Sequence, residues 1–204
     1  MLSVHDASVK IAGYIAGQTG EAEKNPIYTY GMEIILGTVI KFGLILALAM
    51  VTGILKPTFL IIFIAAGFRI LSGGVHCSAY YRCLICGLVV FLSLGYMVQL
   101  ASPLMAMSTL KFFTLTGFIL TLLITICYAP VDTERKLITE TAKRMKMKML
   151  SIIFVFTLYC FILLIDFNKE VTLPFLVGLI WQAFTLTPAG DWVMKKADGM
   201  LTVS

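Results

Sequence analysis

The residues best suited to chemistry lie in one short stretch, from Arg69 to Cys86. It contains one of the two histidines and three of the five cysteines of the chain. A cysteine thiolate attacks a carbonyl carbon readily when a base such as histidine lies within hydrogen-bond distance to activate it. His76 and Cys83 are therefore the candidate general base and nucleophile of a thiol peptidase. Arg69 and Arg82 would either favour the thiolate or hold an acidic part of the substrate.

The spacing of this pair limits the structures that can bring the two side chains together. A continuous helix would place His76 and Cys83 about 10 Å apart along its axis, at about 1.5 Å per residue, which is too far for proton transfer. If the two residues act together, the segment between them cannot be a single straight helix. Gly73 and Gly74 would give the backbone the freedom to place His76 on a turn that folds back. Cys83 would then lie near the start of a helix, where the helix dipole favours a thiolate.

The same stretch allows two other interpretations. Cys83 and Cys86 form a C-x-x-C pair, which would suit a membrane thiol–disulfide oxidoreductase. Alternatively, the chain is a peptide exporter in which these groups are structural. A zinc site is not favoured, because His76 and three cysteines would have to converge and no second paired motif exists; we expect no metal and no cofactor. Cys127 and Cys160 are each alone in an apolar stretch and are expected to be buried.

The composition around this stretch is that of a membrane protein. Of the 204 residues 59% are hydrophobic and 13% charged, against about 45–50% and about 25% in soluble globular chains. Mean hydropathy is +0.95. These values exclude a soluble enzyme, a disordered tail and a conventional nucleic-acid binder. Since a spanning helix needs about 20 apolar residues, we predict an all-α, polytopic protein with about six transmembrane helices, the second short or partial: 32–55, 58–71, 83–101, 110–129, 150–166 and 171–188.

Residues 1–26 differ from the rest of this single membrane domain, 1–204. Apolar residues in the first 18 positions recur near helical spacing, which predicts an amphipathic helix on the membrane surface followed by a linker. A short helix packed on the bundle is the alternative that the pattern leaves open. The segment has no continuous apolar core and contains His5, Asp6 and Lys10, so we do not expect it to be a cleavable signal.

The net charge of +5 is explained by membrane topology. If the N-terminus is cytoplasmic, twelve of the sixteen Lys and Arg residues fall on the cytoplasmic side, as the positive-inside rule requires. Both termini and the stretch from Arg69 to Cys83 are then expected on the cytoplasmic face of the cell membrane. The basic loop 129–149 would attract anionic lipid or an acidic part of the substrate, with Arg135 and Lys136 as candidate substrate-binding residues.

The central motif resembles that of a known family. Residues 73–76 (Gly-Gly-Val-His), followed by Cys83 and preceded by Arg69, resemble the accessory gene regulator B (AgrB) family, the membrane peptidases of Gram-positive peptide quorum sensing. The segment 128–134 (Tyr-Ala-Pro-Val-Asp-Thr-Glu), the length and the multi-span layout are also similar to that family. Where the family pattern leads us to expect a small polar residue, this chain has tyrosines at 80–81.

The resemblance implies that Cys83 is the nucleophile and His76 the general base, with Arg69 and Gly74 in supporting positions. Members of the family remove the acidic C-terminal tail of a propeptide, AgrD, and leave an acyl-thioester on the enzyme cysteine. A cysteine or serine of the substrate then closes a thiolactone or lactone ring. An AgrD-like propeptide is thus the expected partner, with no nucleic acid; a homodimer is suggested by the likeness alone.

Overall fold

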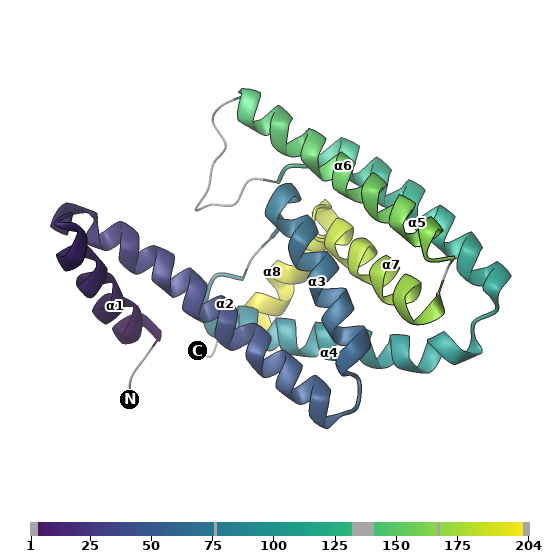
Figure 1. Ribbon diagram of the computed structural model, residues 1–204, viewed down its shortest axis with the longest axis horizontal. Helices are drawn as coiled ribbons and strands as arrows, with labels where there is room; N and C mark the ends of the chain where they lie inside the picture. The colour runs from purple at the N-terminus through teal and green to yellow at the C-terminus, as the bar shows by residue number, and fades with distance from the viewer. Residues whose placement is uncertain (1–3, 76, 132–140, 167, 202–204) are drawn as a thin grey trace. The chain divides into compact units, whose positions relative to one another are not determined.

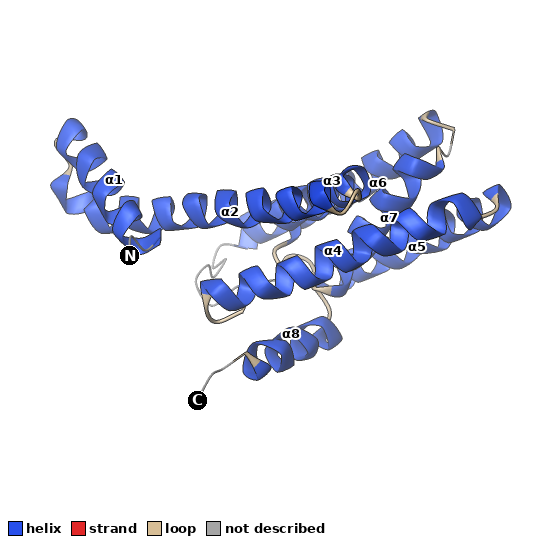
Figure 2. Cartoon of the chain, turned by 90° about the horizontal axis from the view of Figure 1, so that it is seen from below, coloured by secondary structure: helices blue, strands red, loops and turns tan. Residues whose placement is uncertain are grey.

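The computed structural model describes residues 4–75, 77–131, 141–166 and 168–201, and every regular element in these ranges is helical (Figures 1 and 2). The prediction of an all-α chain is confirmed. The described elements are α1 (Val4–Thr19), the short 3-10 helix η1 (Ala22–Lys24), α2 (Asn25–Val51), α3 (Leu55–Ser72), α4 (Tyr80–Leu104), α5 (Met107–Tyr128), α6 (Thr141–Leu164), α7 (Lys169–Phe184) and α8 (Pro188–Met200).

Five helices of the described chain, α2 to α6, are long and apolar enough to cross a membrane. A sixth crossing results if α7 and α8, which meet at an angle of 84°, form one broken span. The prediction of a polytopic protein with about six membrane helices is therefore confirmed. The span that was expected to be short, 58–71, is part of a helix of 18 residues.

Two predicted spans run past the end of one helix as far as the first residue of the next. The span 32–55 runs beyond the end of α2, because Gly53 turns the chain with a φ of +72° that other residues rarely adopt. The span 171–188 crosses the end of α7. There Thr187 caps the next helix by accepting a hydrogen bond from the backbone N–H of Gly190, and Pro188 opens that helix.

The chain divides into two compact units, 1–47 and 48–204. In the first unit, α1 forms the helix expected within residues 1–26. Its buried face consists of small side chains at four-residue spacing, Ser8, Ala12 and Ala16, whereas the larger Ile11 and Tyr14 are exposed. The location of this helix on a membrane surface stays a prediction.

In the second unit, α3 and α7 pack closely together, and α4, α5 and α6 pack around them (Figure 1). The close approach depends on Gly178 of α7, where an added Cβ would lie 2.8 Å from the carbonyl oxygen of Ile61. Phe68 of α3 is fully buried and stacks on Phe154 of α6 at 5.8 Å. This core fixes the last turn of α3, which carries Arg69, against α7.

Candidate functional site

The chain leaves the helical path between the two candidate catalytic residues. α3 ends at Ser72 and α4 begins at Tyr80, so the chain has the helix break that joint action of His76 and Cys83 would require. Cys83 lies in the first turn of α4, where its backbone N–H donates to the carbonyl of Ala79 at 3.1 Å. The positive end of the helix dipole therefore lies beside Cys83, as predicted.

The turn after α3 is paired with a segment far away in the sequence. The N–H of Val131 donates to the carbonyl of Ser72 at 3.0 Å, and Gly73 and Val131 form an isolated parallel bridge. Gly73 has a φ of +73°, and an added Cβ would lie well inside van der Waals contact of the Val131 carbonyl oxygen. Only glycine fits at position 73, so the turn and the segment after α5 depend on each other.

Arg69 holds the next two carbonyl groups of the turn. Its guanidinium donates to the carbonyl of Gly74 at 3.2 Å and to that of Val75. It also lies near Cys83 and Cys77. Arg69 thus fixes the backbone directly before residue 76, which agrees with a supporting position for this arginine.

Gln182 of α7 holds the remaining carbonyl and was not anticipated from the sequence. Its side chain is 1% exposed, and its Nε2 donates to the carbonyl of Gly73 at 2.7 Å and to the hydroxyl of Ser72 at 3.3 Å. Gly74 packs beneath it, because an added Cβ would lie 3.0 Å from Thr185 Oγ1 and 3.1 Å from Gln182 Nε2. A glutamine inside an apolar predicted span was the signal available in the sequence.

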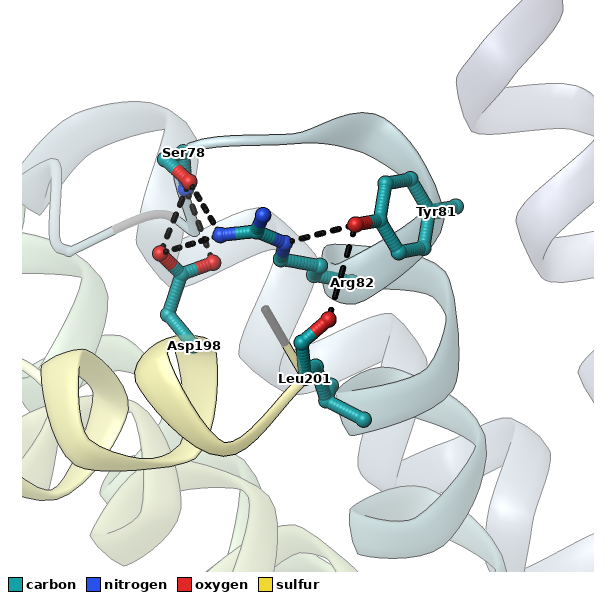
Figure 3. A network of polar contacts seen from close by, with 5 residues as sticks. All are labelled: Ser78, Tyr81, Arg82, Asp198 and Leu201. Carbon is teal, nitrogen blue, oxygen red and sulfur yellow. Dashed lines mark hydrogen bonds and ion pairs between the residues drawn. The ribbon is translucent and has the colours of Figure 1, made fainter. Parts of the chain in front are cut away.

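The far side of the turn is tied to the C-terminal helix (Figure 3). Asp198 of α8 accepts hydrogen bonds from the backbone N–H and the hydroxyl of Ser78, at 3.1 and 2.7 Å, and pairs with Arg82 at 3.3 Å. Arg82 also donates to the hydroxyl of Tyr81 at 2.9 Å. The bonds from Ser78 and the charge of Arg82 hold the pKa of Asp198 below its usual range. Its carboxylate is therefore charged at neutral pH.

Residues 8–186 match the family model described as Accessory gene regulator B. The chain belongs to the AgrB family. It is 28% identical over 187 residues to an AgrB-like protein 2 of Clostridium perfringens strain 13, covering 86% of this chain and 87% of that protein. It is 29% identical over 169 residues to an AgrB-like protein of Listeria innocua, covering 82% and 78%. No solved structure matches the chain.

Membership of the AgrB family, a family of membrane peptidases, implies that the chain processes AgrD-like peptides. The structure brings part of the predicted site together: Arg69 and Gly74 lie at one turn, and Cys83 lies in the first turn of the helix that follows it. His76 lies outside the described residues, as do Arg135 and Lys136, the predicted substrate-binding residues of the basic loop. Their roles stay predictions.

The cysteines of the site form a cluster of free thiols. Burial, together with the nearby Cys86 and Cys83, raises the pKa of Cys77 to about 12. Cys77 is therefore a neutral thiol at physiological pH.

The prediction that Cys127 is buried is wrong. Cys127 is exposed on the outside of α5, where lipid can take the place of protein, and Cys160 is only partly buried. Within the described ranges no group of His, Cys, Asp and Glu side chains is placed to hold a metal ion.

Proposed function

We propose that this AgrB protein is a membrane-embedded cysteine endopeptidase that removes the C-terminal tail of an AgrD-like propeptide. Cys83 is the nucleophile and His76 the general base. The observation that carries the proposal is the break between α3 and α4. A continuous helix would keep a base seven residues before Cys83 about 10 Å away from it, and the helical path is interrupted here. Arg69 and Gln182 hold the backbone of residues 73–75.

The chemistry proceeds in two transfers of one acyl group. His76 takes the thiol proton as the Cys83 sulfur attacks the carbonyl carbon of the scissile bond, and it gives that proton to the leaving amine of the tail. The products are the free tail and an acyl-thioester on Cys83. A substrate cysteine or serine then attacks the thioester, which releases the Cys83 thiol and closes the thiolactone or lactone ring. Exclusion of water from the membrane-embedded site protects the thioester until the ring closes.

The proposal includes an orientation in the membrane. The excess of Lys and Arg supports an orientation with the termini and the site on the cytoplasmic side of the cell membrane. Arg135 and Lys136 would then face the acidic tail of the propeptide, and the basic loop 129–149 would contact anionic lipid headgroups. The family likeness extends the proposal to a homodimer.

Variants of three residues test the reaction in the purified protein, reconstituted with a matching propeptide. Cys83→Ser and His76→Ala should abolish release of the tail. Cys86→Ser, a matched cysteine one helical turn beyond Cys83, should retain it. Full cleavage by the Cys83→Ser variant would end the proposal. Loss of activity in Cys86→Ser together with thiol exchange would favour the oxidoreductase, and transport of processed peptide without cleavage would favour the exporter.

The acyl-enzyme can be trapped directly. A propeptide whose ring-forming cysteine is replaced by alanine cannot close the ring, so mass spectrometry should detect its N-terminal part attached to Cys83. Iodoacetamide should also label Cys83 faster than Cys127 or Cys160, because only Cys83 lies at a helix start beside an arginine. Equal labelling rates at the three positions would argue against an activated thiolate.

A further inference from the structure

The C-terminal helix α8 holds both ends of residues 78–82, the segment that directly precedes the proposed nucleophile (Figure 3). One carboxylate, that of Asp198, accepts two hydrogen bonds from Ser78 and pairs with Arg82. Ser78 lies two residues after His76, and Arg82 lies directly before Cys83. The side chain of Asp198 thus connects the loop after the proposed base to the helical turn that carries the proposed nucleophile.

The first turn of α4 has no capping side chain of its own. Its N-cap is Ala79, which makes no side-chain hydrogen bond to the helix. N-terminal turns are usually fixed by such a cap, because their first N–H groups have no partner within the helix. Here the residues on either side of Ala79, Ser78 in the loop and Arg82 in the helix, are held instead by Asp198.

The geometry of this contact requires a carboxylate. Asp198 Oδ1 accepts from the Ser78 N–H, whereas Oδ2 accepts from the Ser78 hydroxyl and from Arg82 Nη1. The side chains of Arg82 and Asp198 are only 16% and 17% exposed, so water competes weakly for these bonds. Arg82 closes the arrangement by donating to Ser78 Oγ at 3.0 Å. An asparagine has one acceptor oxygen and no charge and cannot make all three contacts.

We propose that Asp198 is a positioning residue of the peptidase, which fixes the first turn of α4 and with it the place of the Cys83 sulfur. This inference rests on the proposed function. Asp198 does not touch the reacting atoms; it acts through Ser78 and Arg82. Its loss therefore slows acyl transfer at saturating propeptide without weakening propeptide binding.

Asp198→Asn in the full-length protein, reconstituted in nanodiscs with its propeptide, tests the inference. Single-turnover release of the tail should slow about 10- to 100-fold, with an unchanged half-saturating propeptide concentration, because charge-assisted bonds are lost. Asp198→Glu, which restores the charge, should recover much of the rate. Asp191→Asn is the matched control: Asp191 lies on the same helix and pairs with Lys195 at 2.7 Å, so this variant should stay within about twofold of wild type.

Hydrogen exchange gives a readout that does not depend on catalysis. The amide of Ser78 should exchange faster in Asp198→Asn than in wild type or Asp191→Asn, because its acceptor is weakened. Ser78→Ala is a milder variant that retains the backbone bond, so it keeps the inference testable if Asp198→Asn does not fold. It should slow tail release about three- to tenfold.

The outcomes separate this inference from the proposed function. If wild type cleaves and Asp198→Asn cleaves equally fast, or if Asp191→Asn slows it as much, Asp198 has no positioning role. The inference is also overturned if the loss appears only in the half-saturating concentration, since Asp198 would then contribute to binding. If Cys83→Ser still cleaves or wild type does not, the proposed function fails and the role of Asp198 fails with it.

Discussion

Replacing Gly73 by alanine tests whether the paired turn is what makes the site competent. Gly73 has φ +73° and ψ −150°, a backbone conformation that is almost restricted to glycine. The methyl group of alanine would also collide with the carbonyl oxygen of Val131. Because that oxygen belongs to the backbone, it cannot move aside as the end of a side chain could. The variant must therefore change the backbone at position 73, open the contact with Val131, or do both.

The size of the effect follows from these two costs. Holding alanine in this conformation costs about 1–3 kcal/mol, and loss of the hydrogen bond from Val131 to Ser72 costs about 0.5–1.5 kcal/mol more. If the competent turn becomes less populated by about 2–4 kcal/mol in total, tail release slows about 30- to 1,000-fold, since about 1.4 kcal/mol corresponds to a factor of ten.

Gly53→Ala is a control for the positive φ without the steric contact. Gly53 has a φ of +72°, within a degree of Gly73, yet nothing lies within 4 Å of an added Cβ. Its cost should be about 1–2 kcal/mol of stability, with tail release within about twofold of wild type. Both variants should be compared by single-turnover tail release in nanodiscs, at a temperature where thermal unfolding shows each to be folded.

The reasoning is refuted if Gly73→Ala, once shown to be folded, cleaves at the rate of Gly53→Ala. The turn would then tolerate a side chain at position 73, and its pairing with Val131 would not govern the reaction. A large loss in both variants would refute it equally, because Gly53 has no contact of this kind.

The environment of Cys77 raises its pKa to about 12, so less thiolate is present at any pH below that value than in an ordinary thiol, whose pKa is about 8.5. At pH 8 peptide mapping should show Cys77 alkylated at least about a hundredfold more slowly than an unperturbed thiol, with labelling still rising towards pH 12. Gln182→Leu should lower the free energy of unfolding by about 1–3 kcal/mol, because the buried carbonyl of Gly73 loses its donor; a melting temperature equal to wild type would contradict this. Glu170→Gln removes an exposed ion pair with Lys56 and should lower the melting temperature by no more than about 3 °C.

Helices were predictable from this sequence because the bilayer imposes their length and composition, and each predicted span lies largely within one helix. Their ends were less predictable. Ile54 and Leu55 continue the apolar run after α2, so the hydropathy of the sequence gives no sign that the helix ends in a turn at Gly53. α2 begins at Asn25, well before the predicted start at 32, because the helical backbone also includes the more polar residues that precede the apolar run.

The residues of the site were predictable where the signal is local. Arg69 and Gly74 interrupt an apolar run, so they can be recognised from the sequence alone. Gln182 and Asp198 lie more than 100 residues from the turn that they contact. Asp198 could not be told from Asp191 by its spacing, since both lie on the same polar helix and only the folded chain brings one of them to Ser78.

The carbonyl groups of the turn explain why donors from three parts of the chain meet there. Breaking a helix in an apolar bundle leaves carbonyls without partners, and each such group is costly unless it is hydrogen-bonded. Here the carbonyl of residue 72 is paired by Val131, that of residue 73 by Gln182, and those of 74 and 75 by Arg69. These donors make a helix break favourable between α3 and α4, and the proposed function requires such a break between a histidine and a cysteine seven residues later.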